Sequence, residues 1–264
     1  MSGPSWRHPG RTGAILYAVF AALLGGVTTV ISRLQVERQR GRRAAAQALP
    51  DGPIIVISNH TSYADGILLA IACRKLGRSL RLLATAGVFR TPVIGPIARR
   101  LGFIPVRRGS ADAAGALDDA AAALAAGEAI GLYPEGRITR HPERWPERSK
   151  TGAVRLALRT GSPIVPVAMV GAHEVVGRRH IVRTLLRNLI LRPKVATKVG
   201  EPIDVRVLVD GAREPDAEAI RAAADVVMWR LVHLVEDLRG ERAPAPEGVE
   251  RAADESGAGE PGQR

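Results

Sequence analysis

The chain has 264 residues, 46% of them hydrophobic, which is enough for one sizeable domain with its own core. Its 38 Lys and Arg against 26 Asp and Glu give a formal net charge of +12, so we expect an acidic partner: anionic lipid, a phosphorylated substrate or nucleic acid. Aromatic residues make up only 3%, which argues against nucleic acid, and the single cysteine, Cys73, excludes an intramolecular disulfide or a multi-cysteine metal site.

The first expected element is an uncharged apolar run over residues 14–32, which as a helix extends about 28 Å, close to the hydrocarbon thickness of a bilayer. Two arginines precede it and a denser arginine cluster follows, which predicts that the rest of the chain lies in the cytoplasm. That order also argues against a secretory signal peptide. Cleavage should closely follow the apolar run, whereas the possible small-residue cleavage site at 46–48 lies beyond the arginine cluster. Gly25 and Gly26 weaken the apolar character, so a helix that lies on the inner leaflet is an alternative to one that spans the membrane. The third alternative is a buried core helix, which the flanking arginine cluster disfavours.

From residue 53 onward, apolar runs alternate with amphipathic patterns. The runs predict buried strands at 53–58, 80–85, 103–106, 129–136 and 162–171, with a candidate edge strand at 194–205. Helices are expected at 66–77, 91–102, 111–127, 150–161 and 216–240. This alternation predicts an α/β fold with a mixed, mostly parallel sheet covered by helices on both faces. We expect residues 1–47 to form an N-terminal membrane helix and basic linker, 48–240 the main domain, and 241–264 a disordered tail.

The stretch SNHTSYADG, at 58–66, combines a histidine and an aspartate after the first buried strand. His60 follows the strand and Asp65 begins the next helix, so a tight turn can bring the carboxylate to the imidazole, where open α/β sheets bind ligands. The pair suits a general base, because the carboxylate fixes the tautomer and leaves the other ring nitrogen to accept a proton. The alternative is that Asp65 caps the helix and His60 is a solvated loop residue.

A metal site or a serine or cysteine nucleophile has weaker support around this loop than the His–Asp pair has. No second histidine or cysteine lies at ligand spacing, so no metal is expected. Neither Ser58 nor Ser62 lies in a G-x-S-x-G context, and Cys73 lies inside an apolar stretch typical of a buried residue. Two further strand ends, GFIPVRRGS at 102–110 and YPEGRITR at 133–140, carry arginines, which either bind a phosphate or form a solvated positive surface.

Taken together and in this order, these blocks resemble the glycerolipid acyltransferase family that includes 1-acylglycerol-3-phosphate acyltransferase. The chain is similar to that family from about residue 53 to 171, which implies an acyltransferase domain over 48–240. The family's NHxxxxD motif is matched by Asn59, His60 and Asp65; GAIPVDRG by residues 102–109; FPEGTRS by Tyr133, Pro134, Glu135 and Gly136; and a PVVPV-like strand by 163–167.

The resemblance implies that His60 is the general base and Asp65 its orienting partner. It places Arg108, Glu135 and Gly136 at the acceptor's glycerol phosphate, with Arg137 close to the position of the family's third-motif arginine. Two departures stand out: Arg107 replaces the usual acidic residue beside Arg108, and Arg137-Ile138 replace the usual Thr-Arg. The acceptor headgroup can therefore differ from that of lysophosphatidate.

We therefore predict a membrane-associated O-acyltransferase that transfers a fatty acyl group from acyl-CoA or acyl carrier protein to lysophosphatidate, giving phosphatidate for phospholipid biosynthesis. It is expected to use no cofactor or metal and to contact the phospholipid bilayer, the lysophospholipid acceptor and, with that donor, acyl carrier protein, but no nucleic acid. Its expected location is the cell membrane, with the active site on the cytoplasmic face. Two alternatives remain: a lyso-ornithine lipid or glycolipid acceptor, and a non-catalytic lipid-binding membrane protein.

Overall fold

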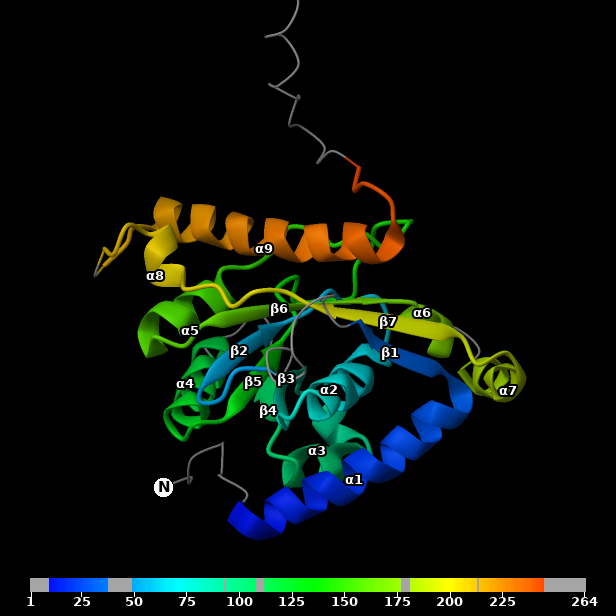
Figure 1. Cartoon of the computed structure of the whole chain (residues 1–264). Coiled ribbons are helices and arrows are strands. Elements are labelled where there is room, and N and C mark those ends of the chain that lie inside the picture. The colour runs from blue at the N-terminus through cyan, green and yellow to red at the C-terminus, as the bar shows by residue number, and fades with distance from the viewer. Residues whose placement is uncertain are drawn as a thin grey trace, which may run out of the picture.

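The computed structural model of the protein describes residues 10–37, 49–92, 94–107, 112–176, 181–212 and 214–244. Their strands form one seven-stranded sheet in the order β1-β7-β6-β2-β5-β3-β4 (Figure 1). All neighbours are parallel except β6 and β7. The predicted mixed, mostly parallel sheet is confirmed. The strands are β1 (Arg33–Glu37), β2 (Ile54–Ile57), β3 (Leu80–Thr85), β4 (Ile104–Val106), β5 (Ala129–Leu132), β6 (Ile164–Val170) and β7 (Lys194–Val199).

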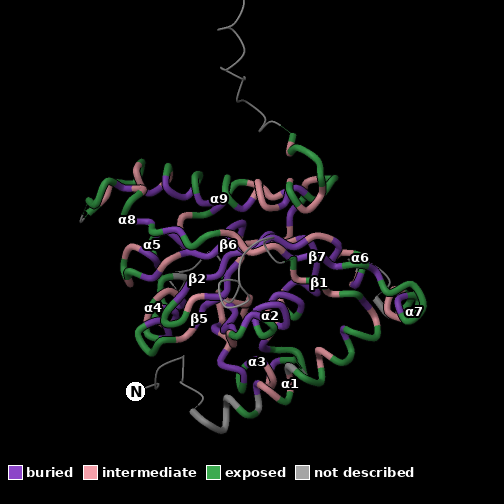
Figure 2. The backbone as a smooth tube through the Cα atoms, viewed as in Figure 1, coloured by how far each residue is buried: buried purple, intermediate pink, exposed green. Residues whose placement is uncertain are grey.

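Helices cover both faces of this sheet, as the sequence predicts. Alternate residues of β2 show why: Ile55 and Ile57 pack in one core cluster, whereas Ile54 and Val56 pack in the other. The first cluster is completed by α4 (Asp112–Ala125), α5 (Gly152–Thr160) and α9 (Ala217–Arg239), and the second by α2 (Asp65–Lys75) and α6 (Ala172–Val175). Figure 2 shows the strands as a buried layer between exposed helical surfaces.

Five further elements lie in the described residues. They are α1 (Gly10–Ile31), a 3-10 turn at Val88–Arg90, α3 (Ile94–Arg100), α7 (Ile181–Leu191) and α8 (Val205–Leu208). Of these, α1 and α3 were expected in outline, and α7 was not expected. The predicted tail, residues 241–264, lies outside the described residues from 245 onward.

The edge of the sheet differs from the prediction. Residues 194–199 form β7 as expected, but β7 lies inside the sheet, because β1 pairs with it in parallel from Arg33↔Lys194 to Glu37↔Lys198. The side chains of β1 alternate between exposed and half-buried, and their charges hide the strand pattern from a search for apolar runs. Part of the expected N-terminal linker is therefore a strand of the sheet.

The N-terminal helix forms where the apolar run predicts it, but its packing differs from that of a spanning segment. None of the helices in the described ranges is both long and apolar enough to cross a membrane. The Tyr17 side chain is buried against the domain, where its hydroxyl donates to the Leu80 carbonyl (3.1 Å) and accepts from the Leu80 N–H (3.0 Å). The spanning alternative is thus not supported, since these bonds hold α1 against the start of β3.

Candidate active site

The candidate site lies where two central strands end side by side. β2 and β5 are parallel neighbours, and their last residues, Ile57 and Leu132, are paired. The loop that follows β2 carries His60, and the loop that follows β5 carries Glu135. Because parallel strands bring their carboxyl ends to one edge, two motifs separated by 75 residues meet there.

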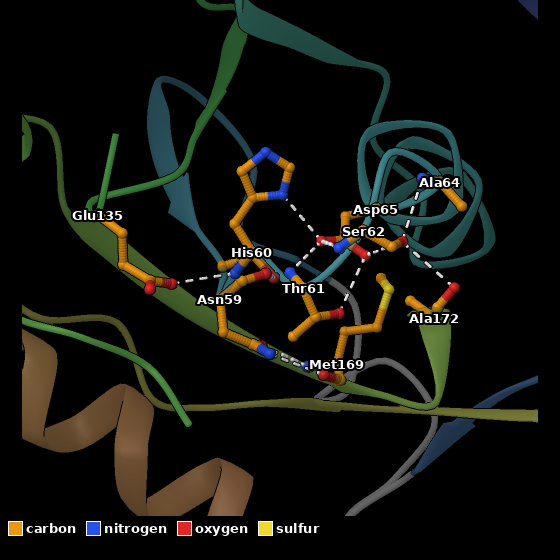
Figure 3. A network of polar contacts seen from close by, with 10 residues as sticks. Asn59, His60, Thr61, Ser62, Ala64, Asp65, Glu135, Met169 and Ala172 are labelled. Carbon is orange, nitrogen blue, oxygen red and sulfur yellow. Dashed lines mark hydrogen bonds and ion pairs between the residues drawn. The ribbon is translucent and has the colours of Figure 1, made fainter. Parts of the chain in front are cut away.

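His60 and Asp65 form the predicted pair. The Nδ1 atom of His60 lies 2.8 Å from Oδ2 of Asp65, and the histidine side chain is 17% exposed against 2% for the aspartate. Figure 3 shows the other ring nitrogen of His60 turned away from Asp65. A carboxylate that accepts the Nδ1 proton leaves Nε2 with a free lone pair, as a general base requires.

The rest of the Asp65 carboxylate is held by the turn before it. Its Oδ2 accepts the backbone N–H groups of Thr61 (2.5 Å) and Ser62 (2.8 Å), and its Oδ1 lies 2.8 Å from the Ser62 hydroxyl. The N-cap of α2 is Ala64, with no side-chain cap. The alternative in which Asp65 caps the helix is therefore wrong: its side chain closes back onto the loop and fixes the carboxylate against His60.

Glu135 holds the backbone of the same loop. It is 4% exposed; its Oε1 accepts the His60 N–H (3.1 Å) and its Oε2 accepts the Glu147 N–H (3.0 Å). On the other side, the His60 carbonyl accepts from the N–H of Thr139 (2.8 Å). The loop after β5 therefore fixes His60 by both of its backbone polar groups.

The Glu135 carboxyl is buried in a way that disfavours its charge. Burial raises its pKa to about 7, an effect partly offset by the two backbone N–H groups that it accepts and increased by the nearby carboxylates of Glu147 and Asp65. An inward-facing carboxyl of this kind supports the loop and is poorly placed to meet a phosphate. The structure thus gives Glu135 a positioning contact with His60.

Two neighbours complete the frame around His60. The Asn59 amide exchanges two hydrogen bonds of 2.8 Å with the backbone of Met169, which ties the end of β2 to β6. Tyr133 stacks on the imidazole, with ring centroids 4.1 Å apart and an interplanar angle of 17°. The first and third motifs are therefore in direct contact through side chains as well as backbone.

The residues expected at the acceptor phosphate are only partly brought together. Arg137 forms an ion pair with Glu147 at 2.8 Å, and its side chain is 39% exposed. Gly136 has φ +70°, a conformation that favours glycine, and its backbone forms the turn that follows Tyr133. Arg108 lies outside the described residues. Arg137 is linked to the His60 loop only indirectly, through Glu147 and Glu135.

The described residues form no arrangement suited to a cysteine nucleophile or a metal centre. Cys73 is fully buried, as predicted, and burial raises its pKa to about 12, so its thiol is poorly suited to be a nucleophile. Within the described ranges, no three His, Cys, Asp or Glu side chains gather closely enough to hold a metal ion. Glu147 contacts both Glu135 and Arg137 but is not predicted from the sequence, because nothing in its local pattern marks it.

A His–Asp pair held at the carboxyl edge of a mostly parallel sheet defines an α/β protein equipped to take a proton from a bound hydroxyl group. The family model described as Acyltransferase matches residues 34–170, just over half of the chain. The chain belongs to this acyltransferase family.

The chain is also similar to individual proteins. An uncharacterised protein of Mycobacterium bovis is 35% identical over 135 residues, covering 47% of this chain and 35% of that protein. A chloroplastic 1-acyl-sn-glycerol-3-phosphate acyltransferase of Brassica napus is 28% identical over 174 residues, covering 64% of this chain and 47% of the relative. The chain therefore spans less than half the length of these curated relatives.

A solved structure shares the fold. The crystal structure of the 1-acyl-sn-glycerophosphate acyltransferase from Thermotoga maritima matches with a TM-score of 0.62 at 22% identity, over 90% of this chain and 86% of that one. At this identity the likeness establishes the α/β architecture. The chemistry depends on the residues of the site and not on the fold.

Proposed function

We propose that the protein is a membrane-associated O-acyltransferase that transfers a fatty acyl group from acyl-CoA or acyl carrier protein to lysophosphatidate, giving phosphatidate for phospholipid biosynthesis. The observation that carries the proposal is the 2.8 Å contact between His60 and Asp65 at the strand ends. The relative from Brassica napus, named as a 1-acyl-sn-glycerol-3-phosphate acyltransferase, supports this acceptor.

In the proposed reaction, Nε2 of His60 takes the proton of the acceptor hydroxyl as its oxygen attacks the thioester carbonyl. Asp65 stabilises the imidazolium that forms. When the tetrahedral intermediate collapses, the carbon–sulfur bond breaks, an ester forms, and the thiol leaves with the proton returned by His60. The transfer needs no acyl-enzyme and no bound cofactor, because a thioester is already reactive.

Arginines are proposed to hold the acceptor phosphate and position its hydroxyl. Arg108 is one, by its place in the second motif, and Arg137 is the other. The ion pair of Arg137 with Glu147 favours a second candidate, because it partly neutralises the cation: an acceptor with a less anionic headgroup, such as a lyso-ornithine lipid or a glycolipid. In either case His60 and Asp65 perform the same chemistry.

The proposed location is the cytoplasmic face of the cell membrane, where the lysophospholipid acceptor is already concentrated. Support comes from the outer face of α1, whose exposed apolar side chains recur every three or four residues. They are Ile15, Val19, Leu23, Val27 and Val30. Such a stripe suits a helix that lies in the interface, and acyl carrier protein, if it is the donor, approaches from the aqueous side.

The acceptor is tested by offering the purified protein a labelled acyl donor with lysophosphatidate, a lyso-ornithine lipid or a hydroxylated glycolipid in turn. We expect the highest kcat/KM for lysophosphatidate. Arg108→Ala should then raise the KM for lysophosphatidate far more than the KM for the acyl donor. Equal effects on both substrates, or faster acylation of another acceptor, would rule out lysophosphatidate as the preferred acceptor.

A further inference from the structure

The helix α7, which the sequence patterns do not predict, has a surface that the proposed chemistry does not use. Its apolar side chains include Leu186, Leu189 and Ile190, which are 61%, 51% and 84% exposed. They stand at positions i, i+3 and i+4, so they share one face of the helix. An exposed apolar face of this size on so short a helix indicates a binding surface.

Cations border this apolar face. Arg183 and Arg187 are exposed and lie four residues apart. Arg183 precedes Leu186 by three residues and Arg187 precedes Ile190 by three, so both arginines lie next to the apolar face. The sequence of α7, IVRTLLRNLIL, contains no acidic residue. A helix with leucines and an isoleucine on one face and arginines along its border has the pattern of helices that lie in the interface of an anionic membrane.

The helix is fixed to the domain on its other side, so its exposed face cannot simply fold inward. Asn188 is fully buried and donates to the carbonyls of Glu174 (2.8 Å) and Val175 (3.0 Å). At its end, the Arg192 guanidinium donates to the Thr29 carbonyl (2.6 Å) of α1. Figure 1 shows α7 beside the C-terminal end of α1, and the two helices are in contact.

We propose that α7 is a second membrane-binding helix, which inserts its apolar face among the lipids of an anionic leaflet while Arg183 and Arg187 bind phospholipid headgroups. This inference rests on the proposed membrane association and adds the surface and the lipid class. A second copy of the chain fits the face less well, because a two-fold contact through α7 would bring arginines together with no carboxylate on the helix to pair with them.

The test is co-sedimentation of the purified full-length protein with vesicles of phosphatidylcholine alone or mixed with phosphatidylglycerol. Leu186→Ser combined with Ile190→Ser should lower the partition coefficient on mixed vesicles by about tenfold or more. Arg183→Gln and Arg187→Gln should each lower it by about fivefold on mixed vesicles, and leave partition on phosphatidylcholine unchanged.

The matched control is Val207→Ser combined with Trp229→Ser, which removes apolar side chains that are 70% and 58% exposed on α8 and α9, on the opposite side of the molecule from α1 (Figure 1). This variant should partition as the wild type does. Circular dichroism melts of all variants check that folding is unaffected, as expected for exposed positions.

The outcomes separate this inference from the proposed chemistry. Acylation in detergent micelles reports on the His60 site, so a wild type that makes no phosphatidate contradicts the proposed function but leaves the vesicle result to decide the role of α7. Wild-type partition by the α7 variant would overturn the inference. So would a lipid-free wild type that is dimeric where the α7 variant is monomeric, because the face would then bind a second copy.

Discussion

At the scale of single residues, the Asp65 carboxylate explains why His60 points where it does. The carboxylate is 2% exposed and accepts bonds from the imidazole and from two backbone N–H groups of the preceding turn. It therefore cannot rotate away without leaving buried donors unpaired. We propose that its role is to fix the tautomer and orientation of His60.

Replacing Asp65 by Asn tests that role. The variant keeps the size of the side chain but removes the charge that stabilises the imidazolium, so kcat should fall by about 10²- to 10⁴-fold. Ser62→Ala is the matched control, since it removes one bond to Asp65 without altering the contact with His60, and its kcat should fall far less. Steady-state kinetics with melting curves check both; equal losses would show that Asp65 only supports the loop.

Glu135 predicts a pH dependence of stability. Burial raises its pKa to about 7, so the folded protein retains a proton that the unfolded chain releases nearer pH 4.5. The contribution of this group to the free energy of unfolding is therefore greatest at low pH and falls as pH rises through about 7. Glu135→Gln removes the titration, so its stability relative to wild type should rise by about 1–3 kcal/mol between about pH 5 and pH 8.

Urea denaturation at both pH values measures this difference. Glu174→Gln, at a side chain that is 53% exposed, is the control and should follow the wild type. If wild type and Glu135→Gln change in parallel with pH, the Glu135 carboxyl is already charged in the folded protein at low pH.

At the scale of elements, Tyr17 fastens α1 to the domain. Tyr17→Phe would leave the Leu80 N–H and carbonyl without the bonds that the hydroxyl makes, and should lower the free energy of unfolding by about 1–3 kcal/mol. Tyr63→Phe, at a side chain 65% exposed, should change it by less than about 0.5 kcal/mol. Equal unfolding midpoints in urea for the two variants would show that α1 does not depend on this contact.

The sequence predicts the elements whose signal is local. The strands β2 to β6 and the main helices are apolar runs and amphipathic patterns bounded by glycine or proline, and they form where expected. By contrast, β1 is a charged alternating stretch whose partner, β7, lies about 160 residues further along the chain. Its pairing is a tertiary effect, and so is the packing that leaves the apolar face of α7 exposed.

In the site, too, local contacts follow from the sequence and tertiary contacts do not. His60 and Asp65 are five residues apart and meet through a single turn, so their contact follows from the sequence. Glu135 reaches His60 only because β2 and β5 are neighbours, and Glu147 reaches Arg137 only because the loop after β5 folds back. The motif resemblance identifies Glu135, but its inward orientation comes from the structure.

At the scale of the whole molecule, the fold places the His60 site at the carboxyl edge of the sheet and the exposed apolar faces on α1 and α7. The net charge of +12 adds attraction to an anionic surface. An enzyme that acts on membrane lipids needs both a catalytic site and a surface that binds the membrane. We propose that the His60 and Asp65 pair catalyses the transfer of an acyl group to lysophosphatidate.

The most direct measurement is phosphatidate formation from labelled acyl-CoA or acyl carrier protein and lysophosphatidate, by purified wild type, His60→Ala and His233→Ala. His233 lies on α9 and contacts Glu236, so its variant controls for the loss of a histidine elsewhere. We expect phosphatidate from wild type and His233→Ala, and a rate lower by about 10²- to 10⁴-fold for His60→Ala. No phosphatidate from the wild type with either donor, or an undiminished rate in His60→Ala, would contradict the claim.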